Sequence, residues 1–292
     1  MTIYIILAAI ALLIIAAVAV IYHDTHSFVV RSYDIDTDKI DGDYTFVFLT
    51  DLHGYVYGDN NDKLLAAIDE VNPDAVLCAG DMFIAMKKHG RIEYDAGFHV
   101  LTELAEKYKV YLANGNHEKK IKTFTKTYGN FFDRYRDTLK RAGVVFLEND
   151  SVNLDGNNIR ITGLDLGLEF FRKIRKRKMP QGYLDKLLGS ASKDKYQVLI
   201  GHNPQYFPEY ADWGADLSVS GHVHGGIIRL PLVGGIISPA LSLFPKYDGG
   251  EFSKGDKKMI LSRGLGTHTI HVRMFNPGEV DVIRLHEVKN VT

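Results

Sequence analysis

The sequence predicts an α/β domain that follows one N-terminal transmembrane helix. Two observations predict this class. From about residue 44 onward, short β-branched and aromatic runs alternate with segments whose apolar residues recur at helical spacing, a pattern typical of sheet strands crossed over by helices. An uncharged apolar run of about twenty residues precedes them, and this length is enough to cross a bilayer.

The apolar run from Ile3 to Tyr22 is interpreted as an uncleaved anchor over residues 1–22. A cleaved signal peptide is the alternative, but the basic n-region is missing and the run exceeds the usual h-region of roughly 7–15 residues. We therefore expect a single-pass protein of the cell membrane. The flanking charges, Arg31 and Lys39 on one side and the terminal amine on the other, leave the side that holds the folded domain open.

Residues 23–43 are polar with one short strand-like piece, and we interpret them as a stalk that leads into one domain over residues 44–292. Up to residue 150, strands and helices alternate in the order 44–51, 61–72, 74–81, 96–108, 109–116, 131–143 and 144–150. The later chain is rich in predicted strands, at 158–165, 196–202, 215–222, 225–231, 258–264, 270–275 and 280–286. Because no linker interrupts this series, we predict mixed sheets between helices in one domain.

The composition is that of an ordinary globular chain. Its 292 residues are 46% hydrophobic and 24% charged, which suffices for one large domain with a substantial core. The formal net charge of -1 gives no overall field that attracts nucleic acid, so no nucleic-acid partner is expected. Cys78 is the only cysteine, which excludes an intrachain disulfide and a cysteine-rich zinc site.

Metal-capable side chains follow five predicted strands in succession. The blocks are Asp51-Leu52-His53, Gly80-Asp81, Gly115-Asn116-His117-Glu118, Gly201-His202 and Gly221-His222-Val223-His224. Because ligands bind beyond the carboxyl ends of strands in open α/β sheets, we expect these side chains to converge. Oxygen and imidazole ligands without thiolate suit Mn, Fe or Zn, and they are too many for one tetrahedral ion.

Each block taken alone also has a structural interpretation. Asp51 or Asp81 after a strand is an ordinary helix N-cap or turn residue. His202 before Asn-Pro is an ordinary loop residue, and the glycines around His222 and His224 also suit a hairpin turn. The ordered recurrence of all five blocks at strand ends favours a metal site.

In this order, the five blocks resemble the signature of the calcineurin-like metallophosphoesterases, over about residues 44–286. The N-terminal apolar segment, "GHVHGGIIRLP" and the later "SRGLGT" resemble the bacterial membrane-associated branch of that family. The resemblance implies a four-layer α/β/β/α sandwich with two divalent metal ions at the sheet ends. It also implies the ligands: Asp51, His53 and His224 for the first metal, Asn116, His202 and His222 for the second, and Asp81 as the bridge.

In this resemblance His117 corresponds to the general acid and Glu118 to its orienting neighbour. One departure is "GDMFIA", where Ile84 stands in place of a second aspartate that many members carry; this leaves the metal ligands intact but weakens their outer support. The same block lacks the arginine of the Ser/Thr protein phosphatases, so protein phosphatase activity is not expected.

The implied reaction is hydrolysis of a phosphodiester, phosphomonoester or pyrophosphate by a metal-bridging hydroxide, with His117 donating a proton to the leaving oxygen. Mn is the expected metal, with Fe or Zn as alternatives. The resemblance leaves the oligomeric state open.

The basic segment 172–178 carries six cations. It is either an ordinary solvated surface or, together with the apolar stretch 231–244, a contact with lipid headgroups. The first interpretation is the more common one for such a run, whereas beside a membrane anchor the second would hold the domain against the lipid. Our leading expectation for the substrate is a lipid-linked or envelope-associated phosphate ester. Two alternatives stay open, a membrane-tethered hydrolase of soluble nucleotide phosphodiesters and a non-catalytic metal-binding scaffold.

Overall fold

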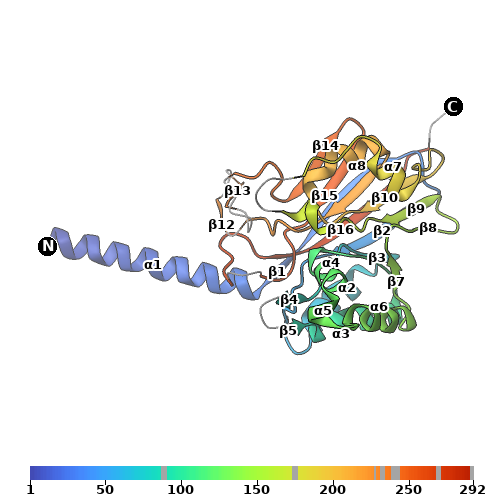
Figure 1. Ribbon diagram of the computed structural model, residues 1–292. Helices are drawn as coiled ribbons and strands as arrows, with labels where there is room; N and C mark the ends of the chain where they lie inside the picture. The colour runs from blue at the N-terminus through green and yellow to red at the C-terminus, as the bar shows by residue number, and fades with distance from the viewer. Residues whose placement is uncertain are drawn as a thin grey trace.

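A computed structural model describes residues 1–86, 91–172, 177–226, 228–230, 234–237, 244–267 and 271–289. Helix α1 projects from a body built on two six-stranded sheets (Figure 1). The first sheet has the order β1-β16-β2-β3-β6-β7, and the second has the order β14-β15-β11-β10-β9-β8. Two short hairpins, β4-β5 and β12-β13, lie outside these sheets.

The first sheet contains β1 (Phe28–Thr37), β2 (Tyr44–Leu49), β3 (Ala75–Cys78), β6 (Lys109–Ala113), β7 (Val145–Leu147) and β16 (Gly278–Glu287). The second contains β8 (Ser151–Asn153), β9 (Ile159–Gly163), β10 (Tyr196–Ile200), β11 (Leu217–Ser220), β14 (Gly250–Lys254) and β15 (Lys257–Leu261). The hairpins are β4 (Ile84–Met86) with β5 (Arg91–Glu93), and β12 (Ile228–Leu230) with β13 (Gly234–Ile237). The helices are α1 (Thr2–His26), α2 (Asp62–Val71), α3 (Asp95–Lys107), α4 (Asn116–Thr123), α5 (Thr125–Tyr128), α6 (Phe131–Arg141), α7 (Tyr183–Leu188) and α8 (Phe207–Trp213), with short 3-10 turns η1 (Leu168–Phe171) and η2 (Pro204–Tyr206).

The body has four layers because the central strands are apolar on both faces. In β2, Val47 and Leu49 pack in a core shared with α2, α3 and α6, whereas Phe46 and Phe48 pack in the core between the two sheets. Successive side chains of a strand point to opposite faces, which produces this division. On the far side of the second sheet, Leu199 packs with residues of α7 and α8. The predicted four-layer α/β/β/α sandwich is therefore confirmed.

The stalk predicted over residues 23–43 is not what the structure shows for most of that segment. Strand β1 pairs in parallel with β16 along ten residues, from Phe28 opposite Gly278 to Thr37 opposite Glu287. Ile35 of β1 is buried in the core between the sheets. An edge strand buries only part of its surface, so its polar alternate residues made the segment look like a linker.

Strand directions place the end of α1 at a particular edge of the first sheet. β1 runs parallel to β16, β16 runs antiparallel to β2, and β2 runs parallel to β3, which in turn runs parallel to β6. The start of β1 therefore lies on the same side of the sheet as the carboxyl ends of β2, β3 and β6. We call this side, where these strands end, the edge. Helix α1 leaves the body at that edge, as Figure 1 shows.

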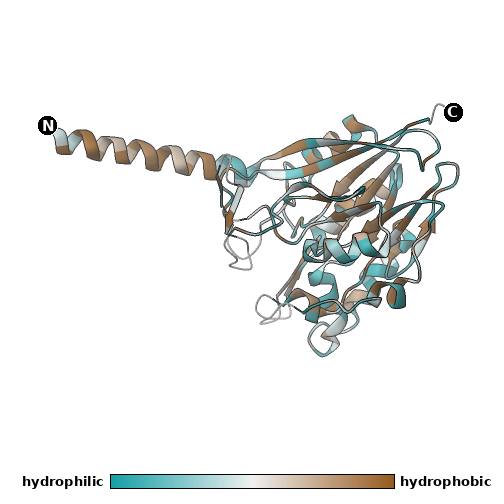
Figure 2. Ribbon diagram, turned by 90° about the horizontal axis from the view of Figure 1, so that it is seen from above, coloured by the Kyte–Doolittle hydropathy of each residue, from teal (hydrophilic) through white to brown (hydrophobic). Residues whose placement is uncertain are grey.

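Helix α1 is long and apolar enough to cross a membrane. Its most apolar window of eighteen residues has a mean hydropathy of 3.1, and none of that window is buried against the body. Figure 2 shows the helix standing apart as a largely hydrophobic rod. The last residues of α1 differ from the rest, because Asp24 and Thr25 are each only 7% exposed.

Deleting residues 1–43 is expected to destabilise the body much more than deleting residues 1–21. The longer deletion removes β1, leaves β16 as an outermost strand with one unpaired side, and takes Ile35 out of the core. Burial of one such side chain contributes roughly 1.5–3 kcal/mol, and each kcal/mol corresponds to about 2–4 °C in a domain of this size. Thermal unfolding should show a midpoint at least about 3 °C lower for the longer deletion. Equal midpoints would contradict a structural role for β1.

Candidate metal centre

The side chains that follow the five strand ends converge in the structure. Three groups have ligand atoms that all lie within 4.8 Å of one another: Asp51, His53 and His224; His53, Asp81 and His117; and Asp81, His202 and His222. His53 and Asp81 each belong to two groups, so the three groups form one continuous centre. Asn116, the first residue of α4, has a buried Oδ1 that accepts no hydrogen bond.

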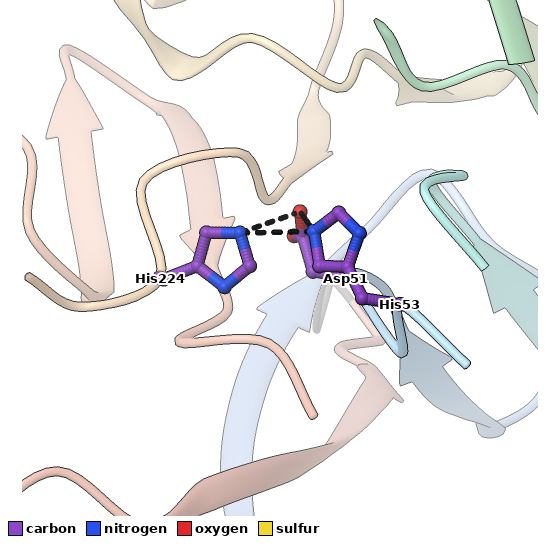
Figure 3. Close-up of side chains that lie close together, drawn as sticks. All are labelled: Asp51, His53 and His224. Carbon is purple, nitrogen blue, oxygen red and sulfur yellow. Dashed lines mark hydrogen bonds and ion pairs between the residues drawn. The ribbon is translucent and has the colours of Figure 1, made fainter. Parts of the chain in front are cut away.

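In the first group, the imidazoles of His53 and His224 and the carboxylate of Asp51 point toward one another (Figure 3). The Nε2 atom of His224 lies 3.3 Å from Asp51 Oδ1, and the Nε2 atom of His53 lies 3.5 Å from the same oxygen. The two Nε2 atoms are 3.1 Å apart. Asp51 Oδ1 is buried and accepts no hydrogen bond. Three donor atoms that point at one another in this way suit a shared cation.

Asp81 lies between the groups. Its Oδ2 is 3.3 Å from His202 Nε2, 3.8 Å from His53 Nε2 and 4.0 Å from His117 Nε2. The His222 ring adds to this side, with its centroid 5.2 Å from that of His202. Asp81 Oδ2 therefore faces imidazoles from three different strand ends, and a fourth imidazole, that of His222, has a nitrogen within 4.8 Å of a carboxylate oxygen of Asp81.

Backbone strain is concentrated at these positions. Asp51, His53, Asp81, His222 and His224 all have positive φ, between 49° and 72°. A non-glycine residue in this region costs of order 1–3 kcal/mol and persists only where its surroundings hold it. Backbone hydrogen bonds from Asp51 to the Gly80 carbonyl and from His53 to the Asp81 carbonyl, both 3.0 Å, help to hold two of them. Such clustering of strain is typical of functional sites.

Each aspartate uses one oxygen for the backbone and turns the other to the centre. Asp51 Oδ2 accepts hydrogen bonds from the His222 N–H at 2.9 Å and from the Thr50 hydroxyl at 3.0 Å. Asp81 Oδ1 accepts the His117 N–H at 2.7 Å. These bonds fix both carboxylates before any ligand is bound, which is how outer contacts orient metal ligands.

His202 and His117 both turn Nε2 toward Asp81, but the proton of the neutral ring lies on different nitrogens. The Nδ1–H of His202 donates to the Ala79 carbonyl at 2.7 Å, so its Nε2 carries the lone pair when the ring is neutral. His117 has the reverse arrangement, because its Nδ1 accepts the Ala85 N–H at 2.8 Å. The proton of neutral His117 therefore sits on Nε2, the atom nearer to Asp81. His202 is suited to bind a cation, and His117 to donate a proton.

Glu118 supports the centre through hydrogen bonds to backbone N–H groups. Its carboxylate accepts the N–H groups of Asp81 at 2.8 Å, Gly115 at 3.0 Å and Met82 at 3.1 Å. Burial and the charge of Asp81 raise the pKa of Glu118 to about 8, and the backbone hydrogen bonds oppose this rise. Glu118 thus ties the loop after β3 to the start of α4. It is a positioning residue, and none of these contacts involves a side chain of the centre.

The electrostatics of the centre favour positive charge. Burial alone would raise the pKa values of Asp51 and Asp81, but the neighbouring imidazoles lower both well below their usual range. Burial would lower the pKa of His202, and the charges of Asp81 and Asp51 instead raise it to about 9. Two carboxylates buried this deeply need compensating cations, so the donor set and the charge both fit divalent metal ions.

Asn276, which the sequence did not mark as functional, supports the loop that carries His224. Its side-chain N–H groups donate to the His224 carbonyl at 2.8 Å and to the Gly226 carbonyl at 2.7 Å. The strand predicted over residues 270–275 is wrong, because the described residues 271–275 form no strand beyond a single bridge residue, Met274. Arg273 holds that backbone by donating to the carbonyls of Arg263, Gly264 and Asn276, at 3.0, 2.9 and 3.1 Å.

The end of α1 contacts the same loop. Asp24 Oδ2 accepts the Asn276 N–H at 3.0 Å, and Thr25 Oγ1 accepts the Arg273 N–H at 3.1 Å. Asn276-Pro277 is a recognisable turn signal in the sequence, but no local pattern links it to residues 24 and 25. The polar end of the apolar helix is thus part of the scaffold around the centre.

A four-layer sandwich with a buried aspartate–histidine centre at its strand ends is the architecture of a metal-dependent phosphoester hydrolase. Residues 44–226 match the family model of the calcineurin-like phosphoesterases, and the chain belongs to this family. Members are typically dinuclear, in keeping with the buried His/Asp groups described above. The expected enzyme class is therefore confirmed.

Three bacterial relatives resemble the chain. The metallophosphoesterase YkuE of Bacillus subtilis, which is named as uncharacterized, is 25% identical over 250 residues, covering 83% of this chain and 79% of the relative. The metallophosphoesterase Cj0846 of Campylobacter jejuni, named in the same way, is 28% identical over 265 residues, covering 88% and 63%. The phosphodiesterase YaeI of Escherichia coli is 25% identical over 226 residues, covering 77% and 76%.

Replacing Asn276 by alanine is expected to weaken metal binding. The change removes both hydrogen bonds that hold the His224 loop, and loss of an outer contact of this kind typically lowers metal affinity by roughly 10–100-fold. Titration of the metal-free protein with Mn²⁺, followed by electron paramagnetic resonance, measures the change. Asn157→Ala, which removes an exposed hydrogen bond to the Asp41 carbonyl, is the control. Equal affinities for the two variants would contradict the supporting role of Asn276.

Proposed function

We propose that the chain hydrolyses a phosphodiester, phosphomonoester or pyrophosphate with the help of two divalent cations, and that its substrate is lipid-linked or otherwise associated with the cell envelope. One observation carries the catalytic part of this proposal. Asp81 Oδ2 lies within 4.0 Å of imidazole nitrogens from three different strand ends, as a carboxylate shared by two cation sites would.

The family resemblance implies the cation ligands, and the grouping of the described side chains supports the assignment. Asp51, His53 and His224 would hold one cation; Asn116, His202 and His222 would hold the other; and Asp81 would contact both. The buried Oδ1 atoms of Asp51 and Asn116, which accept no hydrogen bond, support this assignment. Mn²⁺ is our first choice because the donors are oxygen and imidazole without thiolate, and Fe and Zn remain the alternatives.

Cations bound there would lower the pKa of a bound water and stabilise negative charge on the phosphoryl oxygens. The chain itself supplies the proton for the leaving group. His117 keeps its proton on Nε2 because the Ala85 N–H occupies Nδ1, so the ring can donate to the leaving oxygen. Glu118 accepts the backbone N–H groups of Asp81 and Gly115, and so holds the loops that carry Asp81 and His117 in a fixed relative position. Donation of this kind typically contributes about 10²–10⁴ in rate.

The substrate part of the proposal rests on the surroundings of the centre. The ring of Phe171 lies 5.4 Å from the His222 ring and 5.9 Å from the His202 ring. The basic segment 172–178 begins directly after it, although residues 173–176 lie outside the described part of the chain. The cations of this segment, of which Arg172 directly follows Phe171 in the chain, suit a polyanionic substrate or an anionic membrane surface. The apolar stretch 231–244 is described only at residues 234–237 and 244.

Membrane attachment completes the proposal. We assign residues 1–22 of α1 as a single-pass anchor, on the strength of its hydropathy and its lack of contact with the body. A substrate in or on the membrane is then the one that the enzyme meets most often. The name of the relative YaeI, a phosphodiesterase, favours a diester over a monoester.

Replacing Asp81 by asparagine is expected to lower both metal content and turnover. The amide cannot supply the charge that two cations share, so hydrolysis of bis-p-nitrophenyl phosphate with added Mn²⁺ should fall by at least about 10²-fold. Elemental analysis of the same samples reports bound metal. Asp256→Asn, which changes a carboxylate that is 79% exposed in a turn of the second sheet, is the matched control. Full metal content in Asp81→Asn would refute the shared position.

Hydrolysis of candidate substrates by the full chain in lipid–detergent micelles tests the substrate class. A lipid-linked pyrophosphate or phosphodiester should give a kcat/KM at least about tenfold above that of a soluble nucleotide phosphodiester, since only the former is concentrated at the membrane surface. The opposite order would favour the soluble nucleotide alternative.

Replacing His117 by alanine is expected to have an effect that depends on the leaving group. A p-nitrophenolate ion leaves without a proton, so the variant should lose less than about tenfold in kcat on bis-p-nitrophenyl phosphate. On an alkyl phosphodiester, whose alkoxide must be protonated, the loss should reach about 10²–10⁴-fold. Metal content should stay unchanged. Equal losses on both substrates would rule out a proton-donating role.

A further inference from the structure

We propose that the edge of the body that carries the metal centre lies in the headgroup layer of the bilayer that α1 crosses. In this arrangement an apolar rim, made of Val56, Tyr94, Leu230, Phe244 and Phe275, sits among the lipids. The inference concerns how the body is docked and does not depend on which phosphate ester is hydrolysed.

The first step is that α1 is not loosely tethered. Asp24 and Thr25 are each 7% exposed, and they accept the backbone N–H groups of Asn276 and Arg273. The ring of His26 lies 6.5 Å from that of Tyr55 in the loop after β2. The helix therefore passes directly into buried contacts with the body, and these contacts set the position of the body relative to the helix.

The second step is a distance along the helix. The apolar run ends at Tyr22, and Asp24 follows two residues later, about 3 Å further along the axis. The headgroup layer outside the hydrocarbon core is roughly 5–8 Å thick on each side. If α1 spans the membrane, residues bonded to Asp24 and Thr25 lie at headgroup depth. Asn276 is such a residue, and its side chain also contacts the His224 carbonyl.

The third step is the distribution of exposed apolar side chains. In the described part of the chain outside α1, the large hydrophobic residues that are exposed are Val30, Val56, Tyr94, Leu230, Phe244, Phe275 and Val288. Val288 follows the far end of β16. The five rim residues are 37–63% exposed and all belong to segments that meet at the edge from which α1 leaves.

Contacts between these segments place the rim residues on one surface. Arg229, next to Leu230, donates its N–H to the Met274 carbonyl at 3.1 Å, one residue before Phe275. Phe244 donates to the Ile236 carbonyl at 2.9 Å and so lies against the β12-β13 hairpin. Figure 1 shows both hairpins at the end of the body from which α1 emerges.

The remaining rim residues lie on the loop after β2 and next to it. Val56 stands between Tyr55, which contacts His26, and Tyr57, whose ring contacts Phe28 at 4.9 Å. Tyr94 follows Glu93, whose carbonyl lies 3.3 Å from the position that a Cβ on Gly54 would take. Apolar patches exposed beside a functional site mark interaction surfaces.

The apolar helix indicates that the surface covering the rim is the lipid bilayer. An apolar helix leaves the body beside this surface, and its last residues contact the segments that carry Phe275 and Val56, so the rim adjoins a segment suited to lipid. A consequence, which rests on the proposed function, is that the phosphate of a membrane-resident substrate reaches the centre without leaving the bilayer surface.

Depth-dependent quenching of tryptophan fluorescence tests the docking. Trp213, the only tryptophan, is replaced by phenylalanine, and a reporter is introduced as Phe275→Trp in the full chain. The protein is reconstituted in phosphatidylcholine vesicles with and without bromine on the acyl chains. The matched control is Val288→Trp, because Val288 is similarly exposed, 44% against 42%, but lies about 30 Å away along the ten residues of β16.

We expect bromine near the headgroup end of the acyl chains to reduce the emission of the Phe275→Trp reporter at least about twofold and to leave the Val288→Trp reporter unchanged. Trp213, the last residue of α8, is buried in a core with residues of α7 and β10, so its loss can impair folding. A second series therefore keeps Trp213 and measures the bromine-dependent difference from the wild-type protein.

Two outcomes would overturn the proposal. One is the absence of quenching at both reporters. The other is a blue shift of the Phe275→Trp reporter in lipid-free detergent that grows with protein concentration, which would assign the rim to a second copy of the chain. Neither readout requires turnover or bound metal, so failure here is distinguishable from failure of the proposed function.

Discussion

Two carboxylates buried where the two sheets meet need positive charge beside them, and much of the surrounding structure serves this need. Asp51 and Asp81 are 0% and 2% exposed, and burying a carboxylate without a partner is prohibitively unfavourable. Imidazoles from the ends of β2, β6, β10 and β11 surround them. No single βα unit could assemble this set, so both sheets and the four-layer packing are required to bring the charges together.

Backbone groups fix the geometry of the centre before any cation binds. Glu118 accepts three backbone N–H groups, and the ring of His202 is oriented by the Ala79 carbonyl. Close approach of the loops depends on glycine: a Cβ on Gly80 would lie 1.9 Å from Gly115 N, and one on Gly221 would lie 2.1 Å from Asp51 Oδ2. These contacts hold several ligand residues at positive φ, a strained state that the free chain would not adopt.

The sequence predicts the structure correctly where the pattern is local or where the same pattern recurs after successive strands. The alternation of strands and helices up to residue 150, and the ligand blocks after five strands, follow from periodicity and from the rule that ligands gather at strand ends. Long-range contacts left no such signal. β1 looked like a polar stalk because its partner β16 lies about 250 residues away. Arg273 was assigned to a strand, although its role is to bind carbonyl groups of a loop.

The contacts of Asn276 link the end of α1 directly to the loop of the metal centre. Its backbone N–H bonds Asp24 at the end of α1, and its side chain bonds the carbonyl of His224. A force that tilts or withdraws α1 would therefore act on the loop that carries a proposed ligand, through only two hydrogen bonds. Because Asn276 is fully buried, water cannot replace either bond without opening the edge of the sheet. The polar residues after the apolar run are in this sense part of the scaffold of the centre, and the boundary between the apolar segment and the folded body lies within α1.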